Sequence, residues 1–404
     1  MNVPKLRFKE FNDEWQSINL ADIFQYFGTN SFSREQLSES GILKNLHYGD
    51  IHKKYNSIVN ENDEITSYVK DINYVNKYEL LKNNDLIFAD ASEDYEGIGK
   101  AVEVVNVNNN TISGLHTILA RDNLNVFAPM FKGYYFNSPI VHNQIRVLAN
   151  GFKVYGISKD SINKLNIKVP SINEQSKIAN TLYLLDKKIE LQSKKIEDLK
   201  LFKSSQISSV IDSLKCDEIE LREIGNFISG NAIGKEKIKE SGVPIILYGD
   251  LYTKYWEVID KVEQYTEDNE KYIKSKKNDL LFPTSTTVDS ISLISPSSIN
   301  IDDVIYGGDL IVFRADYTRI NSDFLSYQIN HYKRKEFSKK AQGSTIIHIH
   351  AEDLLSSKVK LPNIEIQNLI SKTFNILNKK IIKEEEKLNK LNNLKKGLMQ
   401  SMFV

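Results

Sequence analysis

The sequence has little of what several classes of protein require. Its 404 residues include one cysteine, Cys216, which excludes an internal disulfide and a thiolate metal cage. No apolar run approaches the ~20 residues that a membrane span needs, and the opening "MNVPKLRFKEF" lacks the long apolar core of a secretory signal. We therefore expect a cytoplasmic protein in a reducing setting, without a membrane segment.

Several catalytic motifs are also absent. None of the eight prolines is adjacent to another, so the Asn/Asp-Pro-Pro-Tyr/Phe motif with which adenine methyltransferases hold a flipped base does not occur. The string "GIGK" at 97–100 lacks the spacing and the following Ser or Thr of a phosphate-binding loop. There is no HExxH motif or Cys/His cluster for a metal ion. The sequence therefore predicts no catalytic residue, metal site or cofactor in this chain.

A strong excess of positive charge is missing as well. Lys and Arg together number 53, as do Asp and Glu, and the formal net charge is zero. The basic signature of many nucleic-acid-binding proteins is thus absent. A DNA partner stays open, because the local distribution of charge matters more than the total.

What the sequence does contain is a long direct repeat. Residues 151–189 align without gaps on residues 343–381, and "YGDIHKKY" at 48–55 is echoed by "YGDLYTKY" at 248–255. The period is far too long for a solenoid repeat. We conclude that the chain contains two copies of a whole domain, each with an attached segment.

Each attached segment has the pattern of a long helix that pairs with another. Apolar residues recur at alternating spacings of four and three, which is the heptad pattern, and a proline (Pro170, Pro362) ends the extended segment before each helix. The predicted seam residues are Ile178, Leu182, Leu185, Ile189, Ile196, Leu199, Ile370, Phe374, Leu377, Ile381, Leu388 and Leu391.

Polar residues interrupt both seams at matching places. They are Gln192 and Glu384 at one place, and Lys203 and Lys395 at another. Such a residue either fixes the register and partner of the helices at a cost in stability, or simply lies exposed at that point of the seam. Both interpretations are open at the level of sequence.

The predicted fold class is α+β. Short strands alternate with Gly, Asn and Ser turns in both copies, and a helix is expected near 321–337. We expect two duplicated mixed α/β domains, at 1–170 and 215–361. Two long antiparallel coiled-coil helices, at 171–214 and 362–404, should separate them and give approximate two-fold symmetry.

This organisation resembles the specificity subunit of type I restriction–modification enzymes. The "P-x-x-x-x-Q" strings that open both helices (170–175, 362–367) look like that family's, as do the opening "PKLRFKEFNDEW", the "LADIF" that follows it and the closing "LNNLKKGLMQSMFV". The resemblance covers essentially the whole chain. Each string alone is a weak signal, whereas their order and duplication are specific.

The resemblance implies a protein that recognises DNA and carries no chemistry itself. Each domain would be a target recognition domain that reads one half of a bipartite sequence in double-stranded DNA. The helices would set the gap between the half-sites and dock two methyltransferase subunits. Motor-nuclease restriction subunits would add cleavage, and S-adenosylmethionine, ATP and Mg would be bound by these partner subunits.

Both copies contain residue types that contact phosphates or base edges. In the first copy the candidate DNA-binding residues are Lys53, Lys54, Tyr55, Ser92, His142, Asn143, Gln144, Arg146, Lys153 and Tyr155. In the second copy they are Lys254, Tyr255, Trp256, Thr284, Ser285, Thr286, Thr287, Lys333, Arg334, Lys335, Lys339, Lys340, Gln342, Ser344 and Thr345. The alternative for each cluster is a solvated helix face or a structural turn.

Structural roles are favoured for two shared features. The Tyr-Gly-Asp triplets at 48–50 and 248–250 fit a turn in which Gly permits an unusual backbone and Asp bonds back to it. Arg121 and Arg314 stand at equivalent places, and for them an ion pair is favoured over a DNA contact.

Two other functions compete with the specificity subunit. One is a self-sufficient DNA methyltransferase or nuclease, which the missing catalytic motifs argue against. The other is a coiled-coil scaffold that does not bind DNA, which explains poorly why a loop-rich domain was duplicated and then diversified.

Overall fold

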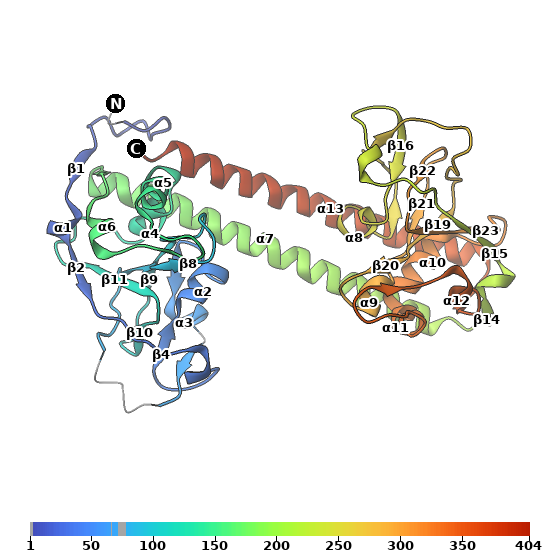
Figure 1. Cartoon of the computed structure of the whole chain (residues 1–404), viewed down its shortest axis with the longest axis horizontal. Coiled ribbons are helices and arrows are strands. Elements are labelled where there is room, and N and C mark those ends of the chain that lie inside the picture. Colours follow the sequence, from blue (N-terminus) through green and yellow to red (C-terminus); the bar gives the residue numbers. More distant parts are fainter. Residues whose placement is uncertain (1–2, 66, 72–77) are drawn as a thin grey trace. The chain divides into compact units, whose positions relative to one another are not determined.

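The computed structural model describes residues 3–65, 67–71 and 78–404. The chain forms two compact units (Figure 1). Unit 1 comprises Met1–Ser193 and Lys387–Val404, and unit 2 comprises Lys194–Glu386. Each unit therefore contains one globular domain together with parts of both long helices.

A five-stranded mixed sheet forms the centre of unit 1. Its strand order is β2 (Phe24–Phe27), β11 (Thr117–Asp122), β7 (Leu86–Ala89), β9 (Ala101–Val105) and β5 (Ile58–Asn60). All neighbours are antiparallel except β5 and β9. Side chains alternate along β7, so that Leu86 and Phe88 enter one core while Ile87 and Ala89 enter another. Both faces are covered, which explains why this strand is apolar throughout.

Short helices and strands surround this sheet. The helices are α1 (Leu20–Ile23), α2 (Tyr48–Lys53), α3 (Glu61–Glu64), α4 (Phe131–Phe136), α5 (Pro139–Leu148) and α6 (Lys159–Asn163), with a 3-10 turn at Arg34–Gln36. A second sheet has the order β10 (Thr111–Ser113), β4 (Lys44–Leu46), β6 (Tyr68–Val69) and β3 (Leu37–Ser38). Two further pairs are β1 (Gln16–Ile18) with β13 (Ile167–Val169), and β8 (Ala91–Ser92) with β12 (Tyr155–Gly156).

Unit 2 repeats the central sheet of unit 1 strand for strand. The order is β15 (Gly225–Ser229), β23 (Leu310–Ala315), β19 (Asp279–Pro283), β21 (Ser297–Ile299) and β17 (Val258–Ile259). Again one edge pair, β17 with β21, is parallel, and the other neighbours are antiparallel. The duplication predicted from the sequence is therefore confirmed at the level of topology.

Most of the remaining elements of unit 2 also have counterparts in unit 1. The helices are α8 (Asp250–Thr253), α9 (Ser290–Leu293), α10 (Ser322–Gln328), α11 (Arg334–Ser338) and α12 (Ala351–Leu355), with 3-10 turns at Leu221–Glu223 and Lys235–Lys237. A three-stranded sheet has the order β18 (Tyr265–Thr266), β16 (Val243–Ile246) and β22 (Ile305–Tyr306). The pairs are β14 (Glu218–Glu220) with β25 (Lys358–Lys360), and β20 (Ser285–Thr286) with β24 (Ile347–His348).

The helix predicted near 321–337 is present, with one local change. A π-helical turn, Ile329–Lys333, joins α10 to α11. Asn137 in unit 1 and Asn330 in unit 2 occupy the same place, since each donates to the carbonyl four residues before it. Two residues later unit 1 has Pro139, which begins a separate helix because proline has no backbone N–H. Unit 2 has Tyr332 there, so the helix continues.

The two long helices are α7 (Ile172–Ser213) and α13 (Ile364–Ser401). Within unit 2 they run antiparallel, because Lys195 pairs with Glu384 (3.1 Å) and Lys203, further along α7, bonds the earlier Asn378 (2.7 Å). Seven of the predicted seam residues are buried and the other five half-buried. The buried ones are Ile178, Leu182, Leu185, Ile196, Ile370, Phe374 and Ile381, and the half-buried ones are Ile189, Leu199, Leu377, Leu388 and Leu391.

The end of α13 belongs to the core of unit 1. Phe403 packs against the rings of Phe131 and Tyr135, with ring centroids 5.9 and 5.4 Å apart. The backbone N–H of Leu6 donates to the carbonyl of Ser401 (2.9 Å). Segments from both ends of the described chain are thus needed to complete this unit.

Candidate nucleic-acid interface

Three candidate segments of unit 1 meet at one place. The loop after β7 leads into β8. β8 pairs with β12, which forms one side of a hairpin at residues 150–156. His52, at the end of α2, places Nε2 2.9 Å from the carbonyl oxygen of Ala91. We call α2, residues 90–97 and residues 150–156 surface 1.

The corresponding segments of unit 2 meet in the same way. β20 pairs with β24 in a hairpin at 342–348, and Tyr252 on α8 donates its hydroxyl to the carbonyl of Ser285 (3.1 Å). We call α8, residues 284–290 and residues 342–348 surface 2. His52 and Tyr252 differ chemically, yet both tie the short helix to the loop strand.

The two hairpins have the same backbone frame. Asn150 and Gly156 exchange two backbone hydrogen bonds, of 3.0 and 2.7 Å, and Gln342 and His348 exchange two of 2.9 and 2.7 Å. Such a closed pair holds the five residues between its ends in a fixed loop.

A glycine is required at the same place in each frame. Gly151 has φ +129° and Gly343 has φ +118°. A Cβ would lie 2.0 Å from the carbonyl oxygen of Val154 in the first hairpin and 2.1 Å from that of Ile346 in the second. The side chains at the tip differ, however: Phe152, Lys153 and Val154 in surface 1 stand where surface 2 has Ser344, Thr345 and Ile346. All six are exposed.

Several candidates of surface 1 are engaged within the protein. Arg146 pairs with Glu96 and Asn143 and lies over the ring of Tyr95. The ring of Tyr155 packs edge-on against that of Tyr95, with centroids 5.2 Å apart. These contacts order the loop 90–97 around the base of the hairpin.

The other candidates on α5 have internal partners too. Gln144 bonds the backbone of Asn166 twice, at 2.9 and 3.2 Å. Burial, with Arg146 close by, lowers the pKa of His142 below its usual value, which favours the neutral imidazole. The structure therefore favours structural roles for Gln144 and His142.

Two candidates of the first copy are buried. Tyr55 lies in a hydrophobic core of unit 1, and Ser92 accepts a hydrogen bond from the backbone N–H of Asp94 (3.2 Å). Lys53 and Lys153 remain exposed, and Lys54 is exposed while paired with Asp50 (3.3 Å). Among the described candidates of the first copy, these three lysines are the exposed charged side chains.

Lys333 departs most from the sequence-based prediction for the second copy. Its side chain is buried, and its ammonium contacts carboxylate oxygens of Glu218 (2.6 Å) and Glu336 (2.8 Å). The lysine run lies on a helix, so one of its members necessarily faces inward. Lys335 and Lys339 are exposed, whereas Lys340 donates to the hydroxyl of Ser356 (2.6 Å).

Other candidates of unit 2 also have structural partners. Lys200 and Lys203 of α7 lie 4.5 and 5.3 Å from the ring centroid of Trp256, so this ring packs on the long helix. Burial raises the pKa of Tyr255 to about 12. Arg334 is half-buried and donates to the carbonyl of Ile291 (2.9 Å), and Lys254 pairs with Asp250 (2.9 Å).

The remaining candidates of unit 2 form the accessible part of surface 2. Thr284, Ser285 and Thr286 are half-buried along β20 and the residue before it. Exposed candidates follow on the loop and on the hairpin: Thr287, Gln342, Ser344 and Thr345. These hydroxyl and amide groups are base-reading types.

The Tyr-Gly-Asp triplets are not turns with an unusual backbone. Neither Gly49 nor Gly249 has a positive φ, and each triplet lies at the start of a short helix. Asp50 is buried and receives two hydrogen bonds from Arg34 (2.8 and 3.1 Å). Asp250 does bond back, accepting from the backbone N–H of Leu247 (2.9 Å).

Arg121 and Arg314 form the ion pairs that were favoured for them. Arg121 donates to both carboxylate oxygens of Asp85 at 2.8 Å. Arg314 does the same to Asp279, at 2.9 and 2.7 Å. These matched pairs brace the equivalent strands in the two units.

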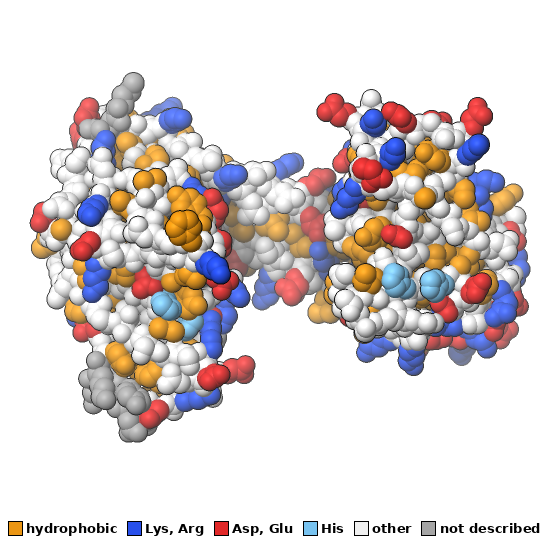
Figure 2. Space-filling model, in the orientation of Figure 1, with side chains coloured by type: hydrophobic (Ala, Val, Ile, Leu, Met, Phe, Trp, Pro, Cys, Tyr) orange, Lys and Arg blue, Asp and Glu red, His pale blue; other side chains and the backbone are white. Residues whose placement is uncertain are grey.

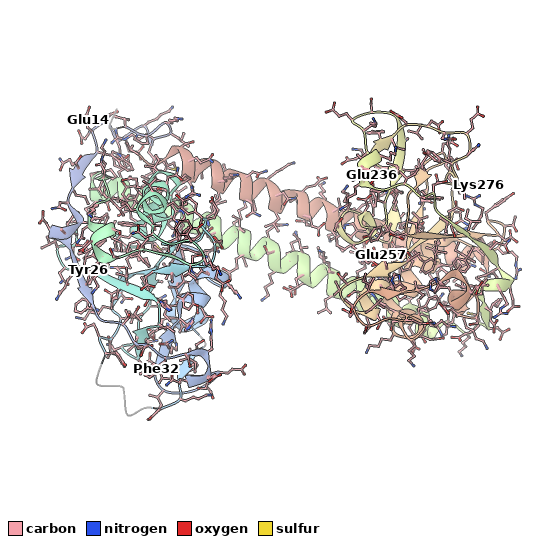
Figure 3. The ribbon with its side chains drawn as sticks, in the orientation of Figure 1. Glu14, Tyr26, Phe32, Glu236, Glu257 and Lys276 are labelled. Carbon is pink, nitrogen blue, oxygen red and sulfur yellow. The ribbon has the colours of Figure 1, made fainter. Side chains whose placement is uncertain are left out.

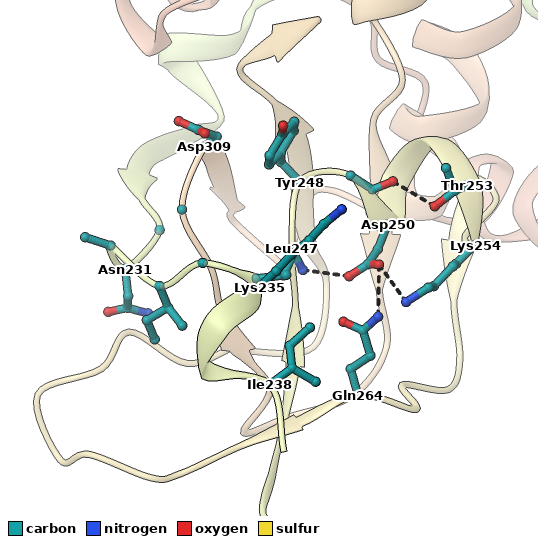
Figure 4. A pocket seen from close by; sticks show the side chains of 16 residues that line it. Asn231, Lys235, Ile238, Leu247, Tyr248, Asp250, Thr253, Lys254, Gln264 and Asp309 are labelled. Atoms are coloured by element: carbon teal, nitrogen blue, oxygen red, sulfur yellow. Dashed lines mark hydrogen bonds and ion pairs between the residues drawn. The ribbon is translucent and has the colours of Figure 1, made fainter. Parts of the chain in front are cut away.

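A cavity of about 740 Å³ beside α8 was not anticipated from the sequence (Figure 4). The loop 230–235, Tyr248 and Lys254 line it. In unit 1, Arg34 stands at the corresponding place, where it bonds Asp50 and lines a smaller cavity of about 450 Å³ together with Lys54. Lys235 precedes α8 as Arg34 precedes α2, but its ammonium forms no ion pair within the described part of the chain. The only sequence signal was "GNAIGK", a glycine-rich loop that ends in a lysine.

Charge is mixed over both units. On the face shown in Figure 2, Lys and Arg side chains are interspersed with Asp and Glu in each unit. Across residues 3–65, 67–71 and 78–404, no group of three or more His, Cys, Asp or Glu side chains could hold a metal ion. No helix in the same ranges has the length and apolar character to cross a bilayer.

The sequence matches one family model twice. The matched residues are 12–201 and 214–393, and the model describes the type I restriction modification DNA specificity domain. Each match takes in one globular domain and much of the long helix that follows it. Together they cover most of the chain.

Two curated proteins of Methanocaldococcus jannaschii are similar to this chain. The putative type I restriction enzyme MjaX specificity subunit is 22% identical over 209 residues, which are 50% of this chain and 48% of that protein. The type I restriction enzyme MjaVIII specificity subunit is 21% identical over 295 residues, 67% of this chain and 68% of that protein. The first similarity thus spans about half of the relative's length.

Two solved structures share the fold. The S subunit of a type I restriction-modification system from M. genitalium has a TM-score of 0.60 and 17% identity, and the match covers 100% of this chain and 99% of that one. A chain from a study of complex assembly and conformational transition of the type I R-M system has a TM-score of 0.57 and 16% identity, covering 97% and 98%.

Proposed function

Because the chain belongs to the type I restriction–modification DNA specificity family, we propose that it is the specificity subunit of such a complex. Each unit reads one half of a bipartite target in double-stranded DNA. The observation that carries this proposal is the pair of matched surfaces: the two hairpins keep one backbone frame and differ at the tip. Two half-sites of different sequence require this combination of constant support and variable contacts.

The chemistry resides in partner subunits. Two methyltransferase subunits bring S-adenosylmethionine and modify an adenine in each half-site. Motor-nuclease subunits, which use ATP and Mg, add cleavage of unmodified DNA. This chain supplies recognition and docking without catalysis, and the assembly acts in the cytoplasm.

The long helices offer matched docking faces for two identical partners. Leu184 on α7 and Ile376 on α13 stand at equivalent positions of the repeat, and their side chains are 68% and 63% exposed. An apolar side chain displayed at the same helical position in both copies fits a contact made twice with the same kind of subunit.

The decisive experiment is adenine-methylation mapping of a genome in a strain that expresses this chain with its partner subunits. We expect methylation at one bipartite sequence with a fixed gap. A second strain carries Phe152→Ser, Lys153→Thr and Val154→Ile, which transfers the tip of surface 2 onto surface 1. One half-site should then change or relax while the other stays the same.

Two outcomes contradict the proposal. One is genome-wide methylation that has no bipartite pattern or that ignores the tip exchange. The other is methyl transfer by the purified chain alone with S-adenosylmethionine, which would indicate a self-sufficient enzyme.

A further inference from the structure

The hairpin of surface 1 carries a large apolar side chain with no cover. The side chain of Phe152 is 100% exposed, and that of Val154, two residues on, is 55% exposed. A phenylalanine in this position contributes nothing to the folding of unit 1, because none of its surface leaves water. The whole ring is therefore available for a contact with another molecule.

The support under Phe152 is rigid. Asn150 and Gly156 close the hairpin, and β12 at its base pairs with β8. The N–H of Ile157 donates to the carbonyl of Asp90 (3.0 Å), which fixes the exit of the hairpin. The backbone that carries the ring is therefore held in place before any partner binds, so only the ring itself remains to be ordered on binding.

We propose that Phe152 is a wedge that enters the base stack of the half-site read by unit 1. This inference rests on the proposed function. Proteins that deform DNA insert Phe, Leu, Ile or Met between neighbouring base pairs and kink the duplex there. Lys153 is exposed beside the ring and is suited to contact the phosphate next to the opened step.

The wedge predicts a feature of the target sequence. Pyrimidine–purine steps unstack most easily, so the half-site of unit 1 contains such a step where the ring enters. Surface 2 has Ser344 and Thr345 in place of Phe152 and Lys153, and these hydroxyls recognise base edges without opening the stack. The DNA is consequently kinked at one half-site and not at the other.

A protein partner explains Phe152 less well than DNA does. The two methyltransferase subunits are identical, so a hairpin that docked them would carry the same tip in both units. Leu184 and Ile376 follow that rule, being apolar at equivalent positions, whereas Phe152 and Ser344 do not. The hairpin tips differ between the two units, and what differs between the ligands of the two units is the DNA sequence of the half-site.

The test uses the complex of this chain with its methyltransferase subunits, bound to duplexes that carry 2-aminopurine at successive positions outside the methylated adenine. With the natural chain, fluorescence should rise several-fold at one step of the half-site of unit 1. Phe152→Ala should abolish this rise and weaken binding roughly tenfold. Phe152→Leu, which keeps an apolar wedge, should retain most of both.

Salt dependence provides a second readout. Phe152→Ala should weaken binding equally at all salt concentrations, because no phosphate contact is lost, whereas Lys153→Ala should reduce the salt slope by about one. Val147→Ala removes another exposed apolar side chain of unit 1 and is the matched control. It should change neither fluorescence nor affinity.

Each alternative outcome overturns the wedge in a distinct way. An unchanged fluorescence profile in Phe152→Ala, with methylation of the bipartite site intact, rejects the wedge and leaves the proposed function standing. Loss of the methyltransferase subunits from the Phe152→Ala complex, measured by mass, means that the ring docks protein. Absence of site-specific methylation with the natural chain removes the proposed function itself.

Discussion

The ammonium of Lys203 lies 2.7 Å from a carboxylate oxygen of Glu257 inside unit 2, and both side chains are buried. Glu257, labelled in Figure 3, also contacts His331 Nε2 (2.6 Å). In unit 1 the equivalent lysine, Lys395, pairs instead with Asp186 of α7 (2.5 Å). The two lysines stand at equivalent positions of α7 and α13. The carboxylate that neutralises the lysine comes from the globular domain in unit 2 (Glu257) and from the other long helix in unit 1 (Asp186).

Removing the carboxylate of Glu257 should destabilise unit 2 strongly. Glu257→Gln leaves Lys203 as a buried charge without its counter-ion, and breaking a buried pair from one side costs about 3–5 kcal/mol. Chemical unfolding of the full chain, followed by the fluorescence of Trp256 in a variant with Trp15→Phe, measures the loss. Lys261→Met is the control: it breaks an exposed pair with Glu263 and should cost less than about 1 kcal/mol.

The stability of unit 1 should begin to fall as the pH drops below neutrality, because of His47. Burial, with the charge of Arg34 nearby, lowers the pKa of His47 to about 4. The unfolded chain, with a histidine pKa near ~6.5, therefore takes up a proton before the folded unit does. The free energy of unfolding should fall as the pH drops from about 6.5 to about 4.

His47→Asn tests this assignment while keeping the helix cap. His47 caps α2 by accepting from the N–H of Gly49 (3.1 Å), and Asn is a good N-cap residue that does not titrate. The variant should keep its stability at neutral pH and lose much of the decrease between pH 6.5 and 4, read from the fluorescence of Trp15. An unaltered pH profile in the variant contradicts the assignment.

The network around Glu257 should lose its stabilising effect on unit 2 only at lower pH. Burial alone would raise the pKa of Glu257, but the hydrogen bond from His331 and the charge of Lys203 outweigh it and hold the pKa below its usual range. A carboxyl with a depressed pKa contributes stability that is lost as pH falls below its unfolded value of ~4.3. Unit 2 should therefore tolerate pH 5 better than unit 1.

Truncating Phe403 should destabilise unit 1, although most of that unit is formed by residues 1–193. Its ring is buried against Phe131 and Tyr135, and Phe403→Ala should cost about 3–5 kcal/mol through the cavity it leaves. Unfolding monitored by Trp15 measures the effect. Leu394→Ala, at an exposed position of the same helix, should stay within about 0.5 kcal/mol.

Charged substitutions on the helix faces should separate docking from folding. Leu184→Glu and Ile376→Glu alter exposed positions, so the isolated chain should unfold as before. Each should weaken binding of one methyltransferase subunit, and the double variant should bind neither, as measured by native mass spectrometry. Exposed Leu124→Glu, which lies in a turn of unit 1, is the control and should leave both subunits bound.

Regular patterns in the sequence predicted the large features of the fold. The duplication, the two long helices and their seams follow from residue spacing, because a buried helical face must repeat every three to four residues. The arginine pairs followed from their matched positions. What spacing cannot give is the partner that a charged residue finds in three dimensions.

Lys333 and Trp256 illustrate that limit. In sequence both look like ligand-binding residues, yet Lys333 meets Glu218, more than a hundred positions earlier, and Trp256 meets two lysines of α7. Conversely, nothing in the string "GFKVYG" distinguishes the fully exposed Phe152 from a core residue. Whether a side chain is exposed depends on the folded unit as a whole, so the neighbouring residues in the sequence do not reveal it.

The packing of Phe403 into unit 1 also sets an order of events during synthesis. Unit 2 is one continuous stretch and can close as soon as it leaves the ribosome, whereas unit 1 needs residues 387–404. At ~5–20 residues per second, its first 193 residues wait roughly 10–40 s for the segment that completes their core. A chain interrupted just after residue 386 therefore leaves the ribosome with one recognition domain finished and the other open.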